Sequence, residues 1–187
     1  DVFINGANYY KSFGPFGDKA LGEAFQLFGE RLTEFIVESK DNVTEFRPNS
    51  ITVNCPVLKT LKLKDIVTLS GTLDIQNANV LQEFNASGTK FNSVLFAATP
   101  TLVNVNMPNT LTDLTLNGLT NIVDSRLLID SYSNLSKIEI VNCPKLDILN
   151  IVNTAYQVGA PLNNVIAYDI NWDINDVGLI RRLAEVK

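Results

Sequence analysis

Apolar residues recur along this chain in a short pattern that returns at a nearly constant interval. The segment NCPVLKTLKLKD, which begins at Asn54, is followed 88 residues later by NCPKLDILNIVN, which begins at Asn142. Weaker copies begin at positions 77, 98 and 120, and an earlier one contains Leu32, Phe35 and Val37. The interval is therefore about 22 residues, which predicts a chain of structural units that stack on one another.

Each unit has two places where apolar and polar residues alternate, as in a strand with one side facing a core. The first place follows the L-x-x-L-x-L spacing of leucine-rich repeats. Its apolar positions would form two stacked interior rows: Leu61, Phe84, Val105, Leu127 and Leu149 in one, and Leu63, Ala86, Met107, Ile129 and Ile151 in the other. The second place has apolar pairs two residues apart: Ile51/Val53, Leu73/Ile75, Val94/Phe96, Leu114/Leu116 and Ile138/Ile140. The pattern predicts a mainly β leucine-rich-repeat solenoid with two short strands per coil and little helix, because such a unit has no room for a long helix as well.

The two ends of the chain depart from the repeat. Residues 1–27 are rich in aromatic residues and glycine, and we expect an N-terminal cap there, with a short helix from Lys19 to Phe28. The array is predicted to span residues 28–162. Residues 163–187 are predicted to form a C-terminal cap, with a last strand from Val165 to Trp172 and a helix that begins after Asp173 or Asn175. All three parts would form one structural domain.

Composition limits the kinds of partner. The net charge of -5 and the pI near 4.7 disfavour binding to nucleic acid, which needs a basic surface. No apolar run approaches the roughly 18 residues that a membrane span requires. Because the first residue is Asp and the last lies within a predicted helix, we expect this segment to be one part of a longer chain or of a multi-copy assembly.

The two cysteines are predicted to be structural. Cys55 and Cys143 occupy the same place in units that are four apart. With stacked strands about 4.8 Å apart, the two would be roughly 19 Å from one another. A disulfide needs Cα atoms within about 7 Å, so both thiols should be reduced and buried.

The sequence offers little catalytic chemistry. The chain has no histidine, which removes the Ser-His-Asp and Cys-His nucleophilic sites and the commonest ligand of transition metals. Four carboxylates, Glu34, Glu83, Asp130 and Asp147, are placed by the repeat on different units and different columns, whereas a glycosidase needs two acids about 5 to 10 Å apart. We therefore expect a protein that is not an enzyme and that needs no cofactor or metal.

The outward positions of the first strand offer a broad surface of mixed character. Repeat proteins commonly bind partners through such extended faces. The residues predicted to form a contact face here are Lys59, Lys62, Asn85, Asn106, Arg126 and Asn150. The partner would be another protein or a glycan.

Several short motifs resemble a known family. The unit from Leu102 to Leu114 (LVNVNMPNTLTDL) is similar to the BspA-like leucine-rich repeats of bacterial surface antigens. The Gly6-Ala7-Asn8 block, the Asn-Cys-Pro-x-Leu units, the Tyr132 to Leu135 turn and the segment from Ile170 to Trp172 together resemble large repeat proteins of phages and prophages of gut bacteria. The consensus asparagine of leucine-rich repeats is replaced by Ile66, Thr89, Thr110 and Thr154, so the usual asparagine ladder should be absent or shifted.

The resemblance implies a non-catalytic structural or interaction module of a bacteriophage virion, associated with the tail or with adhesion. Its partners would be other virion proteins, or a protein or glycan of the host surface. One alternative is a leucine-rich-repeat adhesin on the bacterial cell surface or outside the cell. A second alternative is a polysaccharide-degrading enzyme with a parallel β-helix fold, because its coils have a similar length.

Overall fold

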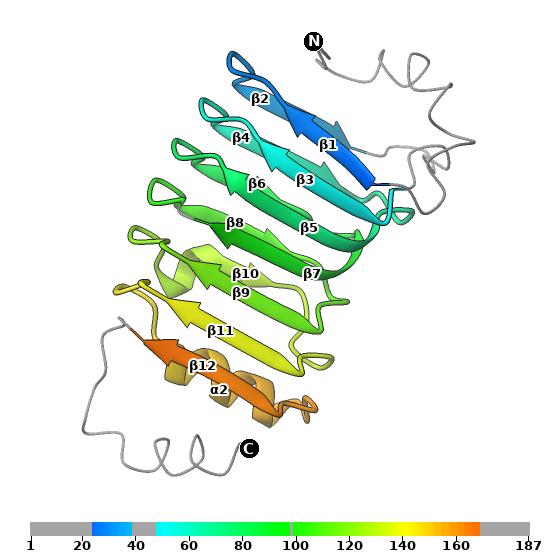
Figure 1. Cartoon of the computed structure of the whole chain (residues 1–187). Coiled ribbons are helices and arrows are strands. Elements are labelled where there is room, and N and C mark those ends of the chain that lie inside the picture. Colours follow the sequence, from blue (N-terminus) through cyan, green and yellow to red (C-terminus); the bar gives the residue numbers. More distant parts are fainter. Residues whose placement is uncertain (1–23, 39–47, 98, 169–187) are drawn as a thin grey trace.

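The computed structural model describes residues 24–38, 48–97 and 99–168. This part of the chain is mainly β and forms a parallel β-solenoid of about six turns, with one α-helix near its C-terminal end (Figure 1). The prediction of a mainly β solenoid is confirmed. No helix among these residues has the length and apolar character needed to cross a membrane.

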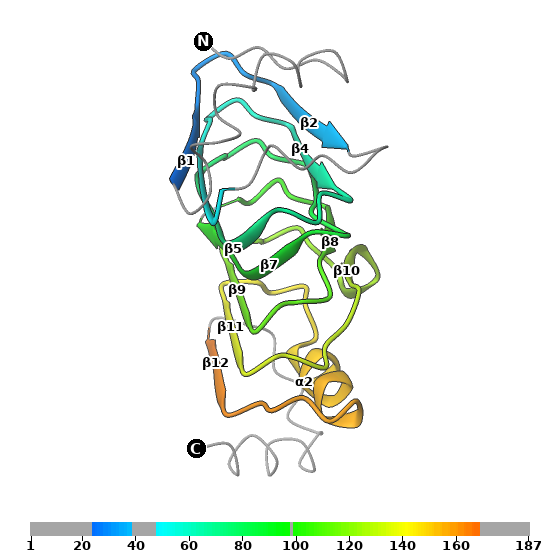
Figure 2. The same cartoon turned by 90° about the vertical axis from the view of Figure 1, so that its right-hand side faces the viewer.

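Strands from Ala24 to Val141 alternate between two parallel sheets, which lie on opposite sides of the stack (Figure 2). The seven-stranded sheet has the order β1 (Ala24–Phe28), β3 (Ser50–Asn54), β5 (Ser70–Asn77), β7 (Lys90–Ala97), β9 (Asp113–Asn117), β11 (Lys137–Val141) and β12 (Asn164–Tyr168). The five-stranded sheet has the order β10 (Leu127–Ile129), β8 (Asn104–Met107), β6 (Glu83–Asn85), β4 (Thr60–Lys64) and β2 (Glu34–Glu38).

The interior is made of apolar rows that pair in register from one coil to the next. In the five-stranded sheet, Phe35 pairs with Leu61, Leu61 with Phe84, Phe84 with Val105, and Val105 with Leu127. All these side chains are buried. The ring of Phe84 meets that of Phe96, from the opposite sheet, edge to face at 5.0 Å between centroids. Side chains of both sheets thus fill one continuous core, and the predicted row is present as far as Leu127.

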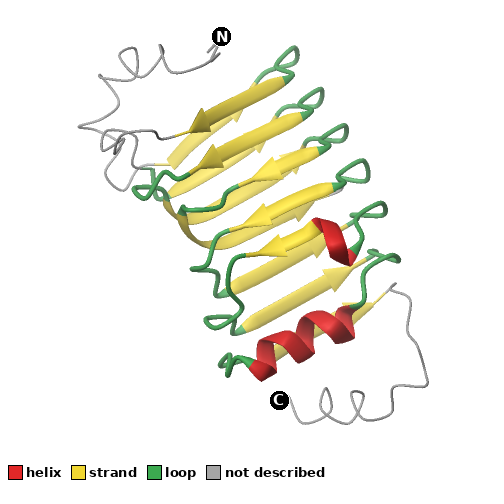
Figure 3. Cartoon of the chain, turned by 180° about the vertical axis from the view of Figure 1, so that it is seen from behind, coloured by secondary structure: helices red, strands yellow, loops and turns green. Residues whose placement is uncertain are grey.

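The predicted row ends there, because Leu149 and Ile151 lie in helix α2 (Ile148–Gln157) and not in a strand. Figure 3 shows this helix at the C-terminal end of the stack. A strand at this place would turn Leu149 and Ile151 inward but leave Ile148 and Val152 on the outer face. The helix instead buries all four together with Ala155, at positions spaced to share one helical face. Since each buried aliphatic side chain contributes about 1.5 to 3 kcal/mol, the helix is the better arrangement.

Both ends of α2 are specified locally. The carboxylate of Asp147 accepts hydrogen bonds from the backbone N–H groups of Leu149 and Asn150, which makes Asp147 the N-cap. At the other end Gly159 has a φ of 73°, and its N–H donates to the carbonyl of Tyr156 while that of Ala160 donates to Ala155. This pair of bonds defines a Schellman motif, which stops the helix.

The ends of the solenoid differ in part from the prediction. Ala24–Phe28 is strand β1, paired with β3, and so the predicted helix from Lys19 to Phe28 is wrong over these five residues. Pairing with β3 turns Leu27 into the core beside Val53, an arrangement that outweighs a weak helical pattern. The predicted last strand is present as β12, and the segments 1–23 and 169–187, including Trp172 and the predicted closing helix, lie outside the described residues.

Candidate interaction surface

The outer side of the five-stranded sheet carries a ladder of side chains in register. Its central column joins residues of five successive strands, which are partners in the sheet: Ile36, Lys62, Asn85, Asn106 and Leu128. A second column, two residues earlier in the chain, contains Glu34, Thr60, Glu83 and Asn104 on strands and Arg126 directly before β10. These columns face outward because the residues between them point into the core. We call the ten residues the ladder face.

The predicted contact residues are only partly brought together. Lys62, Asn85 and Asn106 lie in the central column and are half-buried. Arg126 is exposed at the end of the short 3-10 helix η2 (Asp124–Arg126), directly before β10. Lys59 lies exposed in the turn before β4, at the margin of the ladder face.

Asn150 does not belong to this surface. It lies exposed in the first turn of α2, because the helix replaces the strand that the repeat spacing predicts at that position. The ladder face therefore ends at β10, with Leu128 exposed over 56% of its surface.

Polar contacts across the ladder face join neighbouring strands. The Lys62 ammonium lies 3.2 Å from the Glu83 carboxylate on the next strand, with both side chains partly exposed. The Arg126 guanidinium donates to the side-chain oxygen of Asn104 at 3.4 Å. Surface ion pairs of this kind contribute at most about 1 kcal/mol each, so these side chains are available to other partners at small cost.

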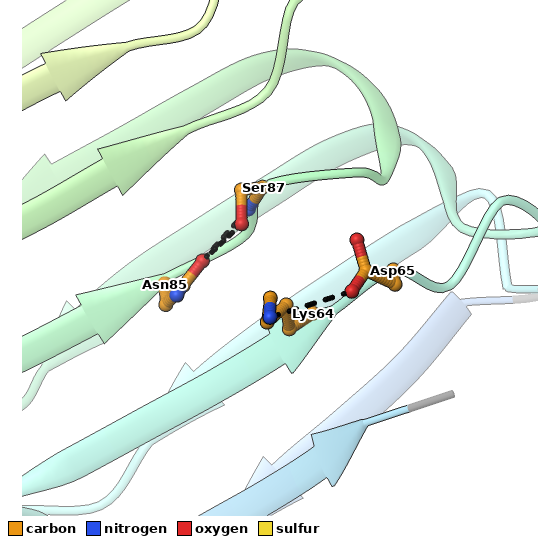
Figure 4. Close-up of polar contacts among 4 residues, drawn as sticks. All are labelled: Lys64, Asp65, Asn85 and Ser87. Atoms are coloured by element: carbon orange, nitrogen blue, oxygen red, sulfur yellow. Dashed lines mark hydrogen bonds and ion pairs between the residues drawn. The ribbon is translucent and has the colours of Figure 1, made fainter. Parts of the chain in front are cut away.

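At one margin of the face, the chain leaves the strands through tight turns (Figure 4). The Lys64 ammonium lies 3.6 Å from the carboxylate of Asp65, whose backbone has a φ of 58°. On the next coil, the side-chain oxygen of Asn85 accepts hydrogen bonds from the N–H and hydroxyl of Ser87. The amide of Asn85 is thus used to shape its own turn.

Hydrogen bonds from polar side chains to neighbouring coils stabilise the corners of the solenoid. Thr101 donates to the carbonyls of Asn79 and Leu81, and Asn121 donates to that of Pro100. These contacts were not predicted, because a threonine or asparagine in a turn is equally compatible with simple exposure to water.

The threonines at the consensus asparagine position also donate to backbone carbonyls. The hydroxyl of Thr89 donates to Ala86 within its own coil at 2.7 Å, and that of Thr110 donates to Phe91 of the preceding coil at 2.6 Å. The hydroxyl of Thr154, in helix α2, donates to the carbonyl of Asn150 at 2.8 Å. Threonine hydroxyls thus donate to backbone carbonyls at three of the four substituted places.

Both cysteines are free and buried, as predicted. The thiol of Cys55 donates to the carbonyl of Leu27, on the preceding coil, at 3.6 Å. The sulfur of Cys143 lies 3.3 Å from the carbonyl oxygen of Val141 and 3.7 Å from that of Leu116, on the preceding coil. Burial raises the pKa of both thiols above the ordinary value of 9.0, against smaller lowering effects of backbone hydrogen bonds. A neutral thiol is a poor nucleophile and metal ligand, so these cysteines serve packing.

The four carboxylates singled out in the sequence are spread over the described part of the chain. Glu34 and Glu83 do share a column, contrary to the prediction, but Thr60 lies between them and Lys62 pairs with Glu83. Asp147 is used as the cap of α2. Among the described residues, no group of three or more histidine, cysteine or acidic side chains is placed to hold a metal ion.

Comparison of the chain with protein-family models, with characterised proteins and with solved structures gives no match. The surface and the motifs of the sequence are therefore the features that bear on function.

Proposed function

We propose that this chain is a non-catalytic interaction module of the leucine-rich-repeat type, with two short strands in each coil, that forms part of a bacteriophage virion and is associated with the tail or with adhesion. The observation that carries the proposal is the ladder face. It presents outward side chains from five strands in register, so that a partner can contact several coils at once.

The character of the ladder face supports binding to a macromolecule. Its centre combines asparagine amides with one ion pair, and its two ends carry Ile36 and Leu128. Interfaces that form and dissociate have this composition, with apolar anchors among hydrogen-bonding groups. Extended, shallow surfaces suit proteins and polymeric glycans better than small substrates.

The origin in a phage particle is supported by the motifs of the sequence. The Asn-Cys-Pro-x-Leu units carry the buried cysteines, and the Tyr132 to Leu135 turn is closed by a hydrogen bond from the N–H of Leu135 to the carbonyl of Tyr132. These motifs therefore serve the stacking of coils. They support the same repeat architecture that the resemblance to phage proteins implies.

Two experiments test the proposal. Detection of the chain by mass spectrometry in purified virions of its source phage supports a virion component, whereas its detection on uninfected bacteria supports a cellular adhesin. Incubation with a panel of polysaccharides tests the absence of catalysis. Release of oligosaccharides would overturn the non-enzymatic assignment and favour the β-helix enzyme.

A further inference from the structure

The order of side chains on the ladder face is nearly symmetrical about β6. From β2 to β10 the central column reads Ile36, Lys62, Asn85, Asn106 and Leu128, with an aliphatic residue at each end and asparagine in the middle. The second column has an acid at one end and a base at the other, Glu34 and Arg126, and both are exposed.

This order makes the ladder face complementary to the same face of a second copy that is related to it by a two-fold axis. If the axis runs along β6, between two facing copies, rotation by 180° reverses the order of strands and keeps the position along each strand. Glu34 of one copy then faces Arg126 of the other, and Ile36 faces Leu128. Since the operation is symmetrical, each of these pairs forms twice. Asn85 faces its own counterpart; because its side-chain oxygen already accepts from Ser87, its NH2 group is what remains to donate to the other copy.

We propose that the ladder face is a self-complementary interface through which a second copy of this chain binds. The proposal rests on the proposed use of this face for contacts and names another copy as the partner. It fits a virion module, because virion components act in many copies.

The unfavourable feature of this arrangement lies near the axis. Glu83 of one copy faces Glu83 of the other, and like charges at short distance repel. Each Glu83 is already paired with Lys62 of its own copy at 3.2 Å, so the two ion pairs together form a neutral group of four charges. The repulsion is thereby largely compensated.

The outer side of the seven-stranded sheet has no such complementarity. Its central column contains Thr52, Asp74, Leu95, Thr115 and Glu139, which are partners along the sheet. No base occurs in this column among the described residues. With the axis along β7, Glu139 would face Thr52 and Asp74 would face Thr115, so no acid of one copy would meet a base of the other. Glu139 is instead paired with Lys137 of its own copy at 2.7 Å. The choice of the five-stranded sheet follows from charge.

The size of the face sets the expected strength. Five strands about 4.8 Å apart and three to five residues long give a flat area of roughly 300 Å² on each copy. The total lies below the roughly 1,200 Å² of stable interfaces, so the dimer should be weak, with a dissociation constant in the micromolar range or above. It should weaken further as salt screens the Glu34 and Arg126 pairs.

The experiment is sedimentation equilibrium of the 187-residue chain and of charge-reversed variants over a wide range of protein concentrations. The expected result is a monomer–dimer equilibrium in which Glu34→Arg and Arg126→Glu each weaken association at least about tenfold, because each places like charges opposite one another twice. The double variant E34R/R126E should restore dimerisation, because it exchanges the two charges. Lys90→Glu replaces a base by an acid, as Arg126→Glu does, but at an exposed position at the start of β7. It should leave the monomer–dimer equilibrium unchanged.

A chain that stays monomeric at every concentration overturns the proposal. So does a dimer that Arg126→Glu weakens no more than Lys90→Glu does, or one that the double variant fails to restore. The outcome is separable from that for the proposed function. A strictly monomeric chain that is nevertheless found in purified virions would remove the dimer and leave the virion module standing.

Discussion

Gly71 offers the sharpest test of how closely the coils approach one another. Its backbone has a φ of 75°, in the region that residues with a side chain avoid. A Cβ placed on Gly71 would lie 1.9 Å from the carbonyl oxygen of Asn49 on the preceding coil. That carbonyl also accepts the N–H of Thr72 at 3.1 Å. The substitution Gly71→Ala therefore forces backbone atoms apart where a hydrogen bond joins two coils.

The expected cost can be worked from three contributions. An alanine in the left-handed region costs about 1 to 2 kcal/mol. Loss of the bond from Thr72 costs about 0.5 to 1.5 kcal/mol, and the backbone shift around the added carbon costs about 1 to 3 kcal/mol. Gly71→Ala should thus lower the free energy of unfolding by roughly 3 to 6 kcal/mol, a large share of the 5 to 15 kcal/mol that is typical of domains.

Gly159 provides the matched control. It has a similar φ of 73°, but a Cβ there would meet no atom within 4 Å. Gly159→Ala should therefore cost only the conformational term, about 1 to 2 kcal/mol. Urea unfolding followed by circular dichroism measures both variants, and hydrogen exchange of β3 and β5 locates the effect. If the two variants were equally stable, the close approach of Gly71 to Asn49 could not be real, and the packing of coils would need to be revised.

Asp147→Ala removes the N-cap of α2 and should lower stability by about 1 kcal/mol in urea unfolding, whereas Asn150→Ala, on the exposed side of the same turn, should change little. Thr99→Val should raise the melting temperature, because the buried hydroxyl of Thr99 has no partner among the described residues and its removal relieves about 1 kcal/mol or more; an unchanged or lower value would indicate a partner. Burial holds the pKa of Cys55 and Cys143 above 9.0 in the folded chain, so the unfolded chain ionises first and stability should fall as the pH rises above about 9, more steeply than in the C55A/C143A variant.

Local pattern was sufficient to predict the interior of the repeats. Leu61, Phe84 and Val105 stack in register because each unit repeats the same alternation at nearly the same interval, and parallel pairing then aligns equivalent positions. The burial of Cys55 and Cys143 follows in the same way from their equivalent places in the units.

Local pattern was insufficient where the same sequence is compatible with two secondary structures. The sequence from Ile148 to Val152 alternates well enough for a strand, yet the helix buries more of its apolar side chains. Ala24–Phe28 has a weak helical pattern, yet β3 offers it a partner. In both cases the secondary structure depends on contacts with residues far away in the chain, which a short stretch of sequence does not contain.

Single residues of the ladder face could be predicted from the sequence, but the extent of the face could not. The outward positions of β4, β6 and β8 follow from alternation, and so Lys62, Asn85 and Asn106 were found. The loss of Asn150 from the face and the pairing of Lys62 with Glu83 depend on which strands are neighbours.

The order and spacing of the apolar residues were sufficient to predict a stack of short parallel strands with leucine-like residues inside, because the positions to be buried recur at a nearly constant interval in the sequence. The folded chain was needed to show where the five-stranded sheet stops, which charges meet across it and how nearly one coil approaches the next at Gly71. These features depend on distances between coils, and such distances are set by packing over the whole stack.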